Sequence, residues 1–412
     1  MKIKTTVKPT GSKFTLLRQL CNFIPPHLVP KLARETGVED QSRTFTPWSH
    51  VVSLLYAQLT HSLGLNDVCD SLRLHSGPLS AVRGATPPHK NTLSHANRTR
   101  DPKMAEQLFW SVFAHLQTLQ PSFGGRRQPR FVFRFKRLMH VVDTTTIQLM
   151  ARALDWAKHR RRKAAAKCHL RLDLQTFLPR CAIVNTAAEH DNVRARELCA
   201  AVQPGEIVIF DKAYLDFSHL ADLSRREVFW VTRAKENLQC RVVRKLQQAP
   251  AGHILRDDVI ELANAASRKD YPVPLRRVRV RVEVDGQWRE MVFLTNNFVW
   301  SAQTIADLYR CRWQIEVFFK ELKQTLQLAD FLGHSEGAVK WQVWMALLAY
   351  VLLRFCAWLG KWSHSFTRLF ALLRAALWQK LELRSLLESC GTAAGGGRFL
   401  GQPEQAYLAG FG

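Results

Sequence analysis

The sequence contains no pair of cysteines with the two-residue spacing that is typical of a zinc site or a redox pair. Its nine cysteines are scattered over 412 residues. Residues 1–6 also lack the pattern of a secretory signal, so nothing indicates an oxidising compartment. We therefore expect reduced, buried thiols in a cytoplasmic protein, without a zinc site or a disulfide framework.

Long hydrophobic runs are also missing. The most apolar stretch covers residues 343–353 and is followed by Arg354, whereas a membrane span requires ~20 apolar residues. This stretch is therefore predicted to be a core helix, and no membrane partner is expected. The sequence also lacks an internal repeat.

Acidic residues are scarce relative to basic ones. The sequence has 34 Asp and Glu against 59 Lys and Arg, which gives a formal net charge of +25. An excess of this size indicates a polyanionic partner, because each neutralised phosphate releases counterions. A membrane surface would also attract a basic protein, but here the charge is spread along the chain rather than gathered in one amphipathic helix. Nucleic acid is therefore the favoured partner.

The length of the chain, with 47% hydrophobic residues, suits a globular protein of about two to three domains. The first part, up to about residue 125, is predicted to be helical. One apolar-periodic helix is expected from Pro47 until Gly64, and Asn66 is expected to cap the next helix. Short helices joined by tight turns, with basic residues nearby, fit a helix-turn-helix-like DNA-binding module. These basic residues are Arg73, Arg83, Lys90, Arg98 and Arg100. The alternative is a helical bundle whose basic side chains are merely solvated.

From about residue 130 strand patterns alternate with helical patterns, which predicts an α/β fold. Strands are expected at 131–135, 138–143, 168–174, 180–185, 205–211 and 228–232, and helices at 193–201 and 217–226. Strands dominate 240–298, where Asp285-Gly286 between two alternating runs predicts a β-hairpin. The last helices are expected at 301–323, 337–360 and 364–389, before a Gly- and Ala-rich end.

Two carboxylates follow buried strands of this α/β part. Asp143 comes after Val141-Val142, and Asp211 comes after Ile209-Phe210. Sites in α/β proteins form at the ends of such strands, although an Asp in this position is often only a turn residue or a helix cap. With Glu316 they make three carboxylates, the number needed to hold two Mg²⁺ ions, because hard cations prefer oxygen ligands.

Glu316 lies in a segment that gathers a phenol, a carboxylate and two cations on one face. At ~100° per residue, Tyr309, Arg312, Glu316 and Lys323 fall within an arc of roughly 60° on a continuous helix. Cations beside a carboxylate suit a site that binds phosphate and holds a metal. A solvated charged face is the alternative, but the aromatic and apolar neighbours of these residues indicate a helix that packs on both sides of the charged stripe.

The order Asp, Asp, Glu with the spacing Tyr309-x2-Arg312-x3-Glu316-x6-Lys323 resembles the Y-R-E-K signature of DDE transposases of the insertion-sequence-four family. Residues 294–296 and 331–335 resemble the family pattern around that helix. The stretch Asp211-Lys-Ala-Tyr214 resembles its second-Asp motif, with Ala213 in place of the usual Gly. The resemblance runs from about residue 130 to 350 and extends less specifically into the helical N-terminal part.

The resemblance implies a ribonuclease-H-like catalytic core over 130–239 and 299–360. A β domain would be inserted into this core at 240–298, because Asp211 and Glu316 are too far apart in the sequence for a single loop. An all-helical DNA-binding domain would occupy 1–125, and a C-terminal helical region with a flexible tail would occupy 361–412.

The resemblance also assigns roles to the carboxylates and to their neighbours. Asp143, Asp211 and Glu316 would be catalytic and would bind two Mg²⁺ ions, for which Mn²⁺ could substitute. Three further side chains would hold terminal phosphates of the transposon end, with a structural ion-pair network as the alternative; these are Tyr309, Arg312 and Lys323.

Two other positions also fall within the resemblance. Trp288, beside the predicted hairpin turn, is a candidate platform on which an extruded base stacks, with a core or cross-strand role as the alternative. His190-Asp191 resembles a His-Asp pair that starts a helix in the family, and we expect a capping and packing role for it.

The implied activity is cut-and-paste transposition. The protein would bind terminal inverted repeats in double-stranded DNA, cleave the DNA with the help of the metal ions, and transfer the freed 3′ end to target DNA. A homodimer would assemble on the DNA in the bacterial cytoplasm, in association with the nucleoid. Two alternatives stay open: a ribonuclease-H-like DNA nuclease without strand transfer, and an inactive relative kept as a DNA-binding protein.

Overall fold

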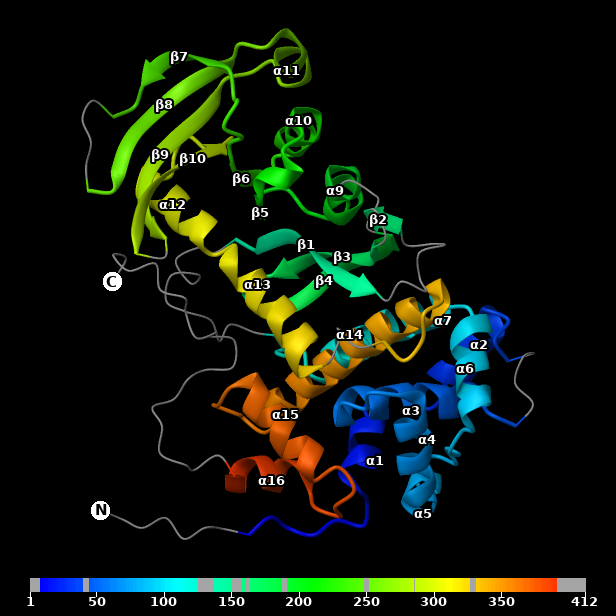
Figure 1. The fold of residues 1–412 in the computed structure, drawn as a ribbon. Coiled ribbons are helices and arrows are strands. Elements are labelled where there is room, and N and C mark those ends of the chain that lie inside the picture. Colours follow the sequence, from blue (N-terminus) through cyan, green and yellow to red (C-terminus); the bar gives the residue numbers. More distant parts are fainter. Residues whose placement is uncertain are drawn as a thin grey trace, which may run out of the picture.

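The computed structural model describes residues 8–39, 44–124, 137–149, 158–160, 163–186, 191–247, 252–284, 286–326 and 331–390. Figure 1 shows a helical lobe beside a lobe built around one long sheet. The helical lobe contains α1 (Leu16–Cys21), α2 (Leu28–Glu35), α3 (Pro47–Thr60), α4 (Leu65–Leu74), α5 (Ser76–Ser80), α6 (Lys90–Thr99), α7 (Lys103–Leu119), α14 (Glu336–Leu359), α15 (Phe366–Ala375) and α16 (Leu383–Cys390). The predicted helix at 364–389 is therefore two helices.

The centre of the helical lobe is α14, which packs against α3, α6 and α7 (Figure 1). Helices from both ends of the chain therefore share one hydrophobic core. Within the described residues, α14 is the one helix long and apolar enough to cross a membrane. However, 89% of its most apolar 18-residue stretch is buried inside the protein. Burial on all sides explains its continuous apolar sequence, and the prediction of a core helix at 343–353 is confirmed.

Local capping sets the helix ends in this lobe. The Thr46 side chain accepts a hydrogen bond from the Ser49 N–H, and Pro47 occupies the first turn of α3, which are strong start signals. The helix ends before His61, whose φ of 57° is left-handed, and so it stops short of the predicted end at Gly64. The next helix is capped by Gly64, whose N–H donates to the Asp67 carboxylate at 2.9 Å, and not by Asn66.

Two of the basic residues that were predicted to lie near DNA are instead bonded inward. Arg100 is buried, and its guanidinium donates to the backbone carbonyls of Phe45 and Thr46. Arg83 donates to the Cys21 carbonyl and stacks on the ring of Trp48. Both arginines join helices of the lobe to one another, which a pattern of basic residues in the sequence does not reveal.

The second lobe is built on a mixed ten-stranded sheet in the order β2-β3-β1-β5-β6-β10-β9-β8-β7, with β4 paired to β3. The strands are β1 (Met139–Leu149), β2 (Lys158–Arg160), β3 (Lys163–Asp173), β4 (Leu178–Thr186), β5 (Ile207–Phe210), β6 (Phe229–Arg233), β7 (Cys240–Lys245), β8 (Ile254–Leu262), β9 (Leu275–Val284) and β10 (Gln287–Thr295). Its helical segments are α9 (Asp191–Cys199), η3 (Lys212–Tyr214), α10 (Phe217–Arg225), α11 (Ala265–Asp270), α12 (Ala302–Arg310), α13 (Trp313–Lys320) and the π-helical turn η4 (Glu321–Thr325).

Three neighbouring strands in the middle of this sheet, β1, β5 and β6, are parallel. All four residues of β5 are buried, because alternate side chains enter two different cores. Ile207 and Ile209 face the core that continues into the helical lobe, whereas Val208 and Phe210 face the core beneath α9 and α10. Burial on both faces explains why the sequence of β5 is continuously apolar.

The strands of 240–298 extend the same sheet. The last of them, β10, pairs antiparallel with β6, and β9, β8 and β7 follow outward (Figure 1). β9 and β10 form the hairpin predicted there, and Gly286 in its turn has a φ of 72°, which favours glycine. Asp285 lies outside the described residues, as do His190 and the predicted strand 131–135.

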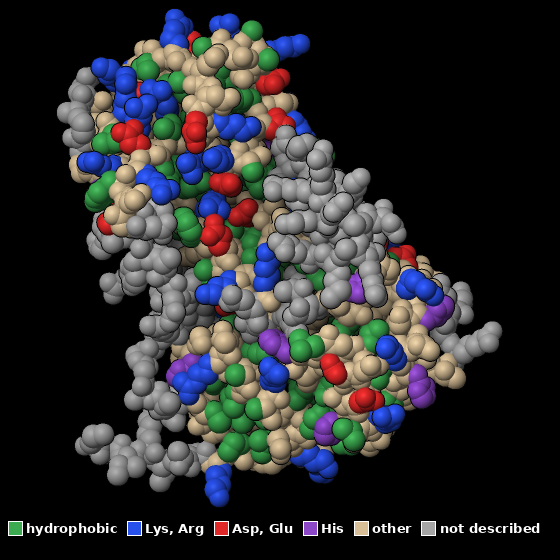
Figure 2. Space-filling model, viewed as in Figure 1, with side chains coloured by type: hydrophobic (Ala, Val, Ile, Leu, Met, Phe, Trp, Pro, Cys, Tyr) green, Lys and Arg blue, Asp and Glu red, His purple; other side chains and the backbone are tan. Residues whose placement is uncertain are grey.

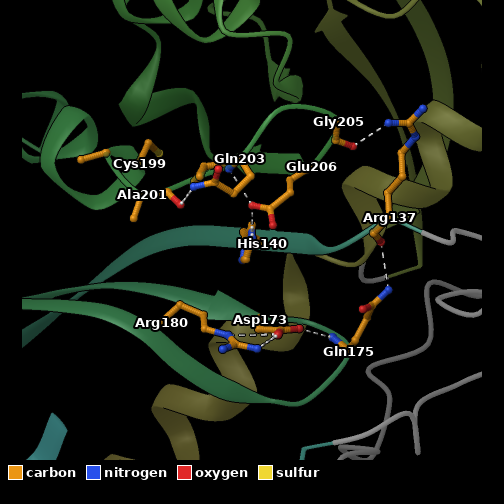
Figure 3. Close-up of polar contacts among 12 residues, drawn as sticks. Arg137, His140, Asp173, Gln175, Arg180, Cys199, Ala201, Gln203, Gly205 and Glu206 are labelled. Carbon is orange, nitrogen blue, oxygen red and sulfur yellow. Dashed lines mark hydrogen bonds and ion pairs between the residues drawn. The ribbon is translucent and has the colours of Figure 1, made fainter. Parts of the chain in front are cut away.

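A group of polar contacts fixes the start of β1 against its neighbours (Figure 3). The buried ring of His140 lies 3.0 Å from the carboxylate of Glu206, just before β5. Asp173, paired with His140 in the ladder, accepts the N–H groups of the following turn and pairs with Arg180 at 2.8 Å. These contacts resist a one-residue slip of β1, which would turn every side chain of the strand to the other face.

The predicted helix at 301–323 is interrupted. α12 ends at Arg310, a turn follows at Cys311 and Arg312, and α13 begins at Trp313. A π-helical turn, Glu321–Thr325, follows α13. The predicted helix is therefore divided, although Cys311 and Arg312 keep right-handed helical dihedral angles. The predicted charged stripe still faces the sheet: Tyr309, Arg312 and Lys323 bond to β1 or to Asp211, and Glu316 pairs with Arg312 one turn away.

Asn296, in the loop after β10, connects that loop to β6. Its side chain accepts the Trp230 N–H and donates to the Val228 carbonyl and to Ser224. We expect Asn296→Ala to lower the free energy of unfolding by about 2–3 kcal/mol, because three hydrogen bonds are lost. Urea denaturation measures this change. Asn264→Ala, at the exposed start of α11, is the control and should cost about 1 kcal/mol; equal losses would contradict the prediction.

Candidate active site

Asp143 and Asp211 lie side by side on neighbouring parallel strands. The last paired residues of β1 and β5 are Val142 and Phe210, so the two aspartates occupy the next position on each strand, and neighbouring strands are about 4.8 Å apart. Asp211 directly follows β5. Asp143 lies inside β1 rather than at its end, because β3 continues to pair with β1 as far as Leu149.

The break between α12 and α13 places three further side chains over this pair. Tyr309, near the end of α12, packs its ring on Phe293 and donates its hydroxyl to the Asp211 carboxylate at 3.2 Å. Arg312 lies in the break, and Glu316 lies in the first turn of α13. The phenol therefore bonds to the carboxylate after β5, whereas the guanidinium bonds to the carboxylate on β1.

Arg312 joins two of the predicted carboxylates. One guanidinium nitrogen lies 2.9 Å from Asp143 and the other lies 2.8 Å from Glu316. The Arg312 side chain is only 11% exposed, whereas Glu316 is 43% exposed. Such charge-assisted bonds are stronger than neutral ones, and Arg312 therefore holds Glu316 over the strand that carries Asp143.

The pKa values reflect this crowding of charge. Burial raises the pKa of Asp143 to about 6, with further increases from Asp211 and Glu316, while Arg312 and the Thr144 N–H oppose the rise. Burial alone would lower the pKa of Arg312, but Tyr309 and the three carboxylates raise it instead. Burial also raises the pKa of Tyr309. All three predicted carboxylates therefore act on one guanidinium, which remains charged.

Lys323 reaches β1 from the π-helical turn. Its ammonium donates to the Thr146 carbonyl at 2.9 Å, three residues beyond Asp143. Burial lowers the pKa of Lys323. This cation therefore lies along the same strand as the aspartate, although no direct bond joins it to a carboxylate in the described contacts.

Trp288 is the one predicted site residue that lies apart from this group. It is 47% exposed near the start of β10, its ring stacks on His253 at 5.4 Å, and Arg281 lies over it at 5.6 Å. A core role is therefore wrong, whereas the alternative of a cross-strand role is confirmed, because the ring packs against Arg281 on β9 and His253 just before β8.

Basic side chains gather on the outer strands of the sheet, β7 to β10, which also carry Trp288. Figure 2 shows Lys and Arg clustered over the region of β7, β8 and β9. Basic residues with partly or fully exposed side chains on these strands and on β10 are Arg241, Arg244, Lys245, Arg256, Arg279, Arg281 and Arg289. Such a surface suits a polyanion such as a nucleic acid.

The carboxylates have the chemistry of a divalent-cation site, but they are arranged around a guanidinium. Within the described residues, no group of three or more His, Cys, Asp or Glu side chains is placed to hold a metal ion. The donors nevertheless fit Mg²⁺ or Mn²⁺, which prefer carboxylate oxygens. Burial, and to a smaller extent Asp211 and Glu316, raise the pKa of Asp143. A bound cation would favour its charged form, and Arg312 supplies a positive charge there.

The sequence did not reveal a buried ion pair at the end of α13. Glu321 pairs with Arg354 at 2.7 Å, and both side chains are largely buried. In the sequence, Arg354 follows the apolar run 343–353. A charge within an apolar helix was nevertheless a usable signal, because buried charges are nearly always paired.

Comparison with known proteins gives two family matches. Residues 135–352 match a family model described as "Transposase DDE domain", and residues 12–82 match a "Domain of unknown function". The first match covers the catalytic candidates and all the described strands of the sheet, whereas the second lies in the helical lobe.

Several curated proteins are similar in sequence. A putative transposase of Sinorhizobium fredii, y4zB, is 31% identical over 73% of this chain and 80% of its own length. A probable transposase for the insertion sequence element IS5377 of Geobacillus stearothermophilus is 28% identical over 82% of this chain and 84% of its own. The transposase InsG for the element IS4 of Escherichia coli is 24% identical over 45% and 42%.

A solved structure with a partly similar fold is the piggyBac transposase synaptic complex with hairpin DNA. It has a TM-score of 0.45 and 10% sequence identity, and the similarity covers 90% of this chain and 83% of that one.

We expect Arg312→Met to raise the affinity of the DNA-free protein for Mn²⁺ by roughly 10-fold or more, because a unit charge a few ångströms away contributes several kcal/mol. The removed guanidinium competes for Asp143 and Glu316. Titration followed by electron paramagnetic resonance measures the free Mn²⁺. Arg310→Met, which removes a charge paired with Asp307 on α12, is the control. Equal or weaker Mn²⁺ binding by the Arg312 variant would contradict the competition.

The raised pKa of Asp143 predicts how stability changes with pH in the metal-free protein. Between pH 3.8 and about 6 the folded state retains a proton that the unfolded state loses, so stability should fall as pH rises through this window. Asp143→Asn should flatten that fall and stabilise the protein near pH 7 by up to about 3 kcal/mol. Urea denaturation across this range measures both effects, and Asp222→Asn on α10 should leave the slope in place. An unchanged slope in the Asp143 variant would refute the assignment.

Proposed function

We propose, because the chain belongs to the transposase DDE domain family, that Asp143, Asp211 and Glu316 are its catalytic carboxylates. The protein is a DNA transposase, an enzyme that cleaves and moves DNA. One observation supports the residue assignment above all others: the three carboxylates surround the single guanidinium of Arg312. Two of them come from adjacent strands, and the third comes from a helix far along the chain.

We further infer membership of the insertion-sequence-four group. The spacing of Tyr309, Arg312, Glu316 and Lys323 supports this, as does the sequence similarity to the IS4 transposase InsG. A ribonuclease-H-like core is supported by the strand order β4-β3-β1-β5-β6, with β1, β5 and β6 parallel. In this proposal the strands of 240–298 are an insertion that prolongs the core sheet, and the helices of 1–125 form a DNA-binding part.

The three carboxylates would hold divalent cations, two Mg²⁺ ions with Mn²⁺ as a substitute. When bound, such ions lower the pKa of water and stabilise negative charge at the reacting phosphate. Asp143 and Asp211 would hold them from the sheet, and Glu316 would do so from α13. Tyr309 would keep the Asp211 carboxylate oriented through its hydroxyl.

The cations beside the carboxylates would bind the DNA end. Arg312 is bonded to Asp143 and Glu316 in the free protein, and its planar fork of donors suits phosphate equally well. We propose that Arg312, Lys323 and Tyr309 hold terminal phosphates. When Arg312 turns to a phosphate, it releases the two carboxylates. DNA binding and completion of the catalytic site would thereby be coupled.

The proposed reaction is cut-and-paste transposition at terminal inverted repeats. A 3′-hydroxyl freed by hydrolysis would attack target DNA, within a homodimer that assembles on the ends in the cytoplasm at the nucleoid. Trp288, exposed and flanked by His253 and Arg281, is proposed as the platform for an extruded base. The basic surface of β7–β10 would follow the DNA backbone.

Glu316→Gln tests the residue assignment. It keeps the shape of the side chain and removes its charge, so binding of end DNA should persist while Mg²⁺-dependent cleavage falls by on the order of 1,000-fold or more. A gel-shift assay and a cleavage assay on labelled end DNA measure the two properties. Glu336→Gln, on the exposed start of α14, should cleave normally. Unchanged cleavage by the Glu316 variant would exclude it from the site.

The same assay separates transposition from hydrolysis alone. Joining of the cleaved 3′ end to an added target plasmid is the expected result. Cleavage without joining, and without dependence on the inverted repeats, would instead favour a nuclease.

A further inference from the structure

A buried ion pair ties the end of the catalytic helix to the core helix α14. Glu321, the first residue of the π-helical turn, lies 2.7 Å from the guanidinium of Arg354, and the two side chains are 16% and 7% exposed. Burial raises the pKa of Glu321, and Arg354 opposes this rise. The pair is therefore in a largely water-excluded environment, where its geometry is sharply defined.

Arg354 is fixed on its other sides as well. Its Nε donates to the Tyr350 hydroxyl at 2.8 Å, and that hydroxyl donates to the Phe177 carbonyl at 3.1 Å. The guanidinium also packs over the rings of Phe177, Tyr350 and Phe366. A single hydrogen-bonded chain thus runs from the turn between β3 and β4, through α14, to Glu321.

Stability alone does not account for this arrangement. Desolvating two charges costs about as much as their attraction returns, and apolar replacements of similar size are often neutral or stabilising. What an ion pair adds over an apolar contact is a defined orientation. We therefore expect the Glu321–Arg354 pair to affect the geometry of the turn Glu321–Thr325 more than the stability of the fold.

That segment has an irregular geometry that bears on Lys323. The Leu326 N–H donates to the Glu321 carbonyl at 3.2 Å, five residues back, which is the π-helical pattern and is frequent at functional sites. Glu321 therefore accepts the π-type bond with its carbonyl while its carboxylate is held by α14. Two residues later, the Lys323 ammonium reaches the Thr146 carbonyl on the strand of Asp143.

We propose that Glu321 and Arg354 are positioning residues, whose buried pair anchors the turn Glu321–Thr325 to α14 and so holds Lys323 at the catalytic strand. The inference rests on the proposed function, because it assigns Lys323 to the binding of the DNA end. It adds that this cation is placed by a contact on the opposite side of the helix from the active site. Neither residue of the pair touches the DNA in this scheme.

The double variant E321M/R354M tests the proposal, because it removes both charges without leaving either unpaired in the core. We expect its thermal midpoint to stay close to that of the wild-type protein, while cleavage of end DNA falls by about 10-fold. Hydrogen exchange measured by mass spectrometry should show faster exchange of the 321–326 amides. E336M/K340M removes an exposed pair from the same α14 and should change neither property. Wild-type cleavage by a folded E321M/R354M protein overturns the proposal.

A double-mutant cycle separates positioning from a merely structural role. If the pair acts through Lys323, E321M/R354M should reproduce the KM and kcat changes of K323A and should add no further loss in the K323A background. An equal fold-loss in both backgrounds overturns the proposal. If the double variant does not fold, R354K keeps the charge but loses the planar fork; it should then show a smaller loss, again absent in the K323A background.

The controls distinguish this inference from the function on which it rests. Wild-type protein that fails to cleave end DNA with Mg²⁺ would contradict the proposed function. Wild-type protein that cleaves, together with a folded E321M/R354M variant that cleaves equally well, contradicts only the role of the pair.

Discussion

Three carboxylates can lie together in a partly buried site only if a positive charge lies among them. In this protein that charge is the guanidinium of Arg312, which bonds to Asp143 and Glu316 and also interacts with Asp211. Most other features of the site serve this arrangement. Arg312 reaches the sheet from the turn between α12 and α13, and the parallel pairing of β1 with β5 brings the two aspartates side by side.

Two polar networks hold this arrangement from outside the site. At the start of β1, His140, Glu206 and Asp173 set the register of the strand (Figure 3). Behind α13, the pair of Glu321 and Arg354 anchors the helix end to α14. Both networks are embedded in apolar surroundings, where hydrophobic contacts alone would permit slippage. The central sheet thus receives its stability from apolar burial and its alignment from a few buried charges.

Much of the fold could be predicted from the sequence. The buried strands β5 and β6, the hairpin of β9 and β10, and the core helix α14 all appear where apolar runs and turn residues indicated them. The interruption at Cys311 and Arg312 was not predicted, because these residues and their neighbours have ordinary helix-forming sequences. Arg83 and Arg100 were interpreted as surface charges, although backbone carbonyls of other helices bind them.

The sequence by itself determined which chemical groups are present: two aspartates beside apolar strands, and a Tyr, Arg, Glu and Lys at fixed spacing. Those features depend on neighbours along the chain, and a local sequence pattern therefore reveals them. Only the tertiary structure decided that Arg312 lies between the carboxylates, that Trp288 is exposed on a hairpin apart from them, and that Glu321 faces a buried arginine. These outcomes depend on which distant segments are buried together. Burial of an unpaired charge costs so much free energy that buried charges are paired.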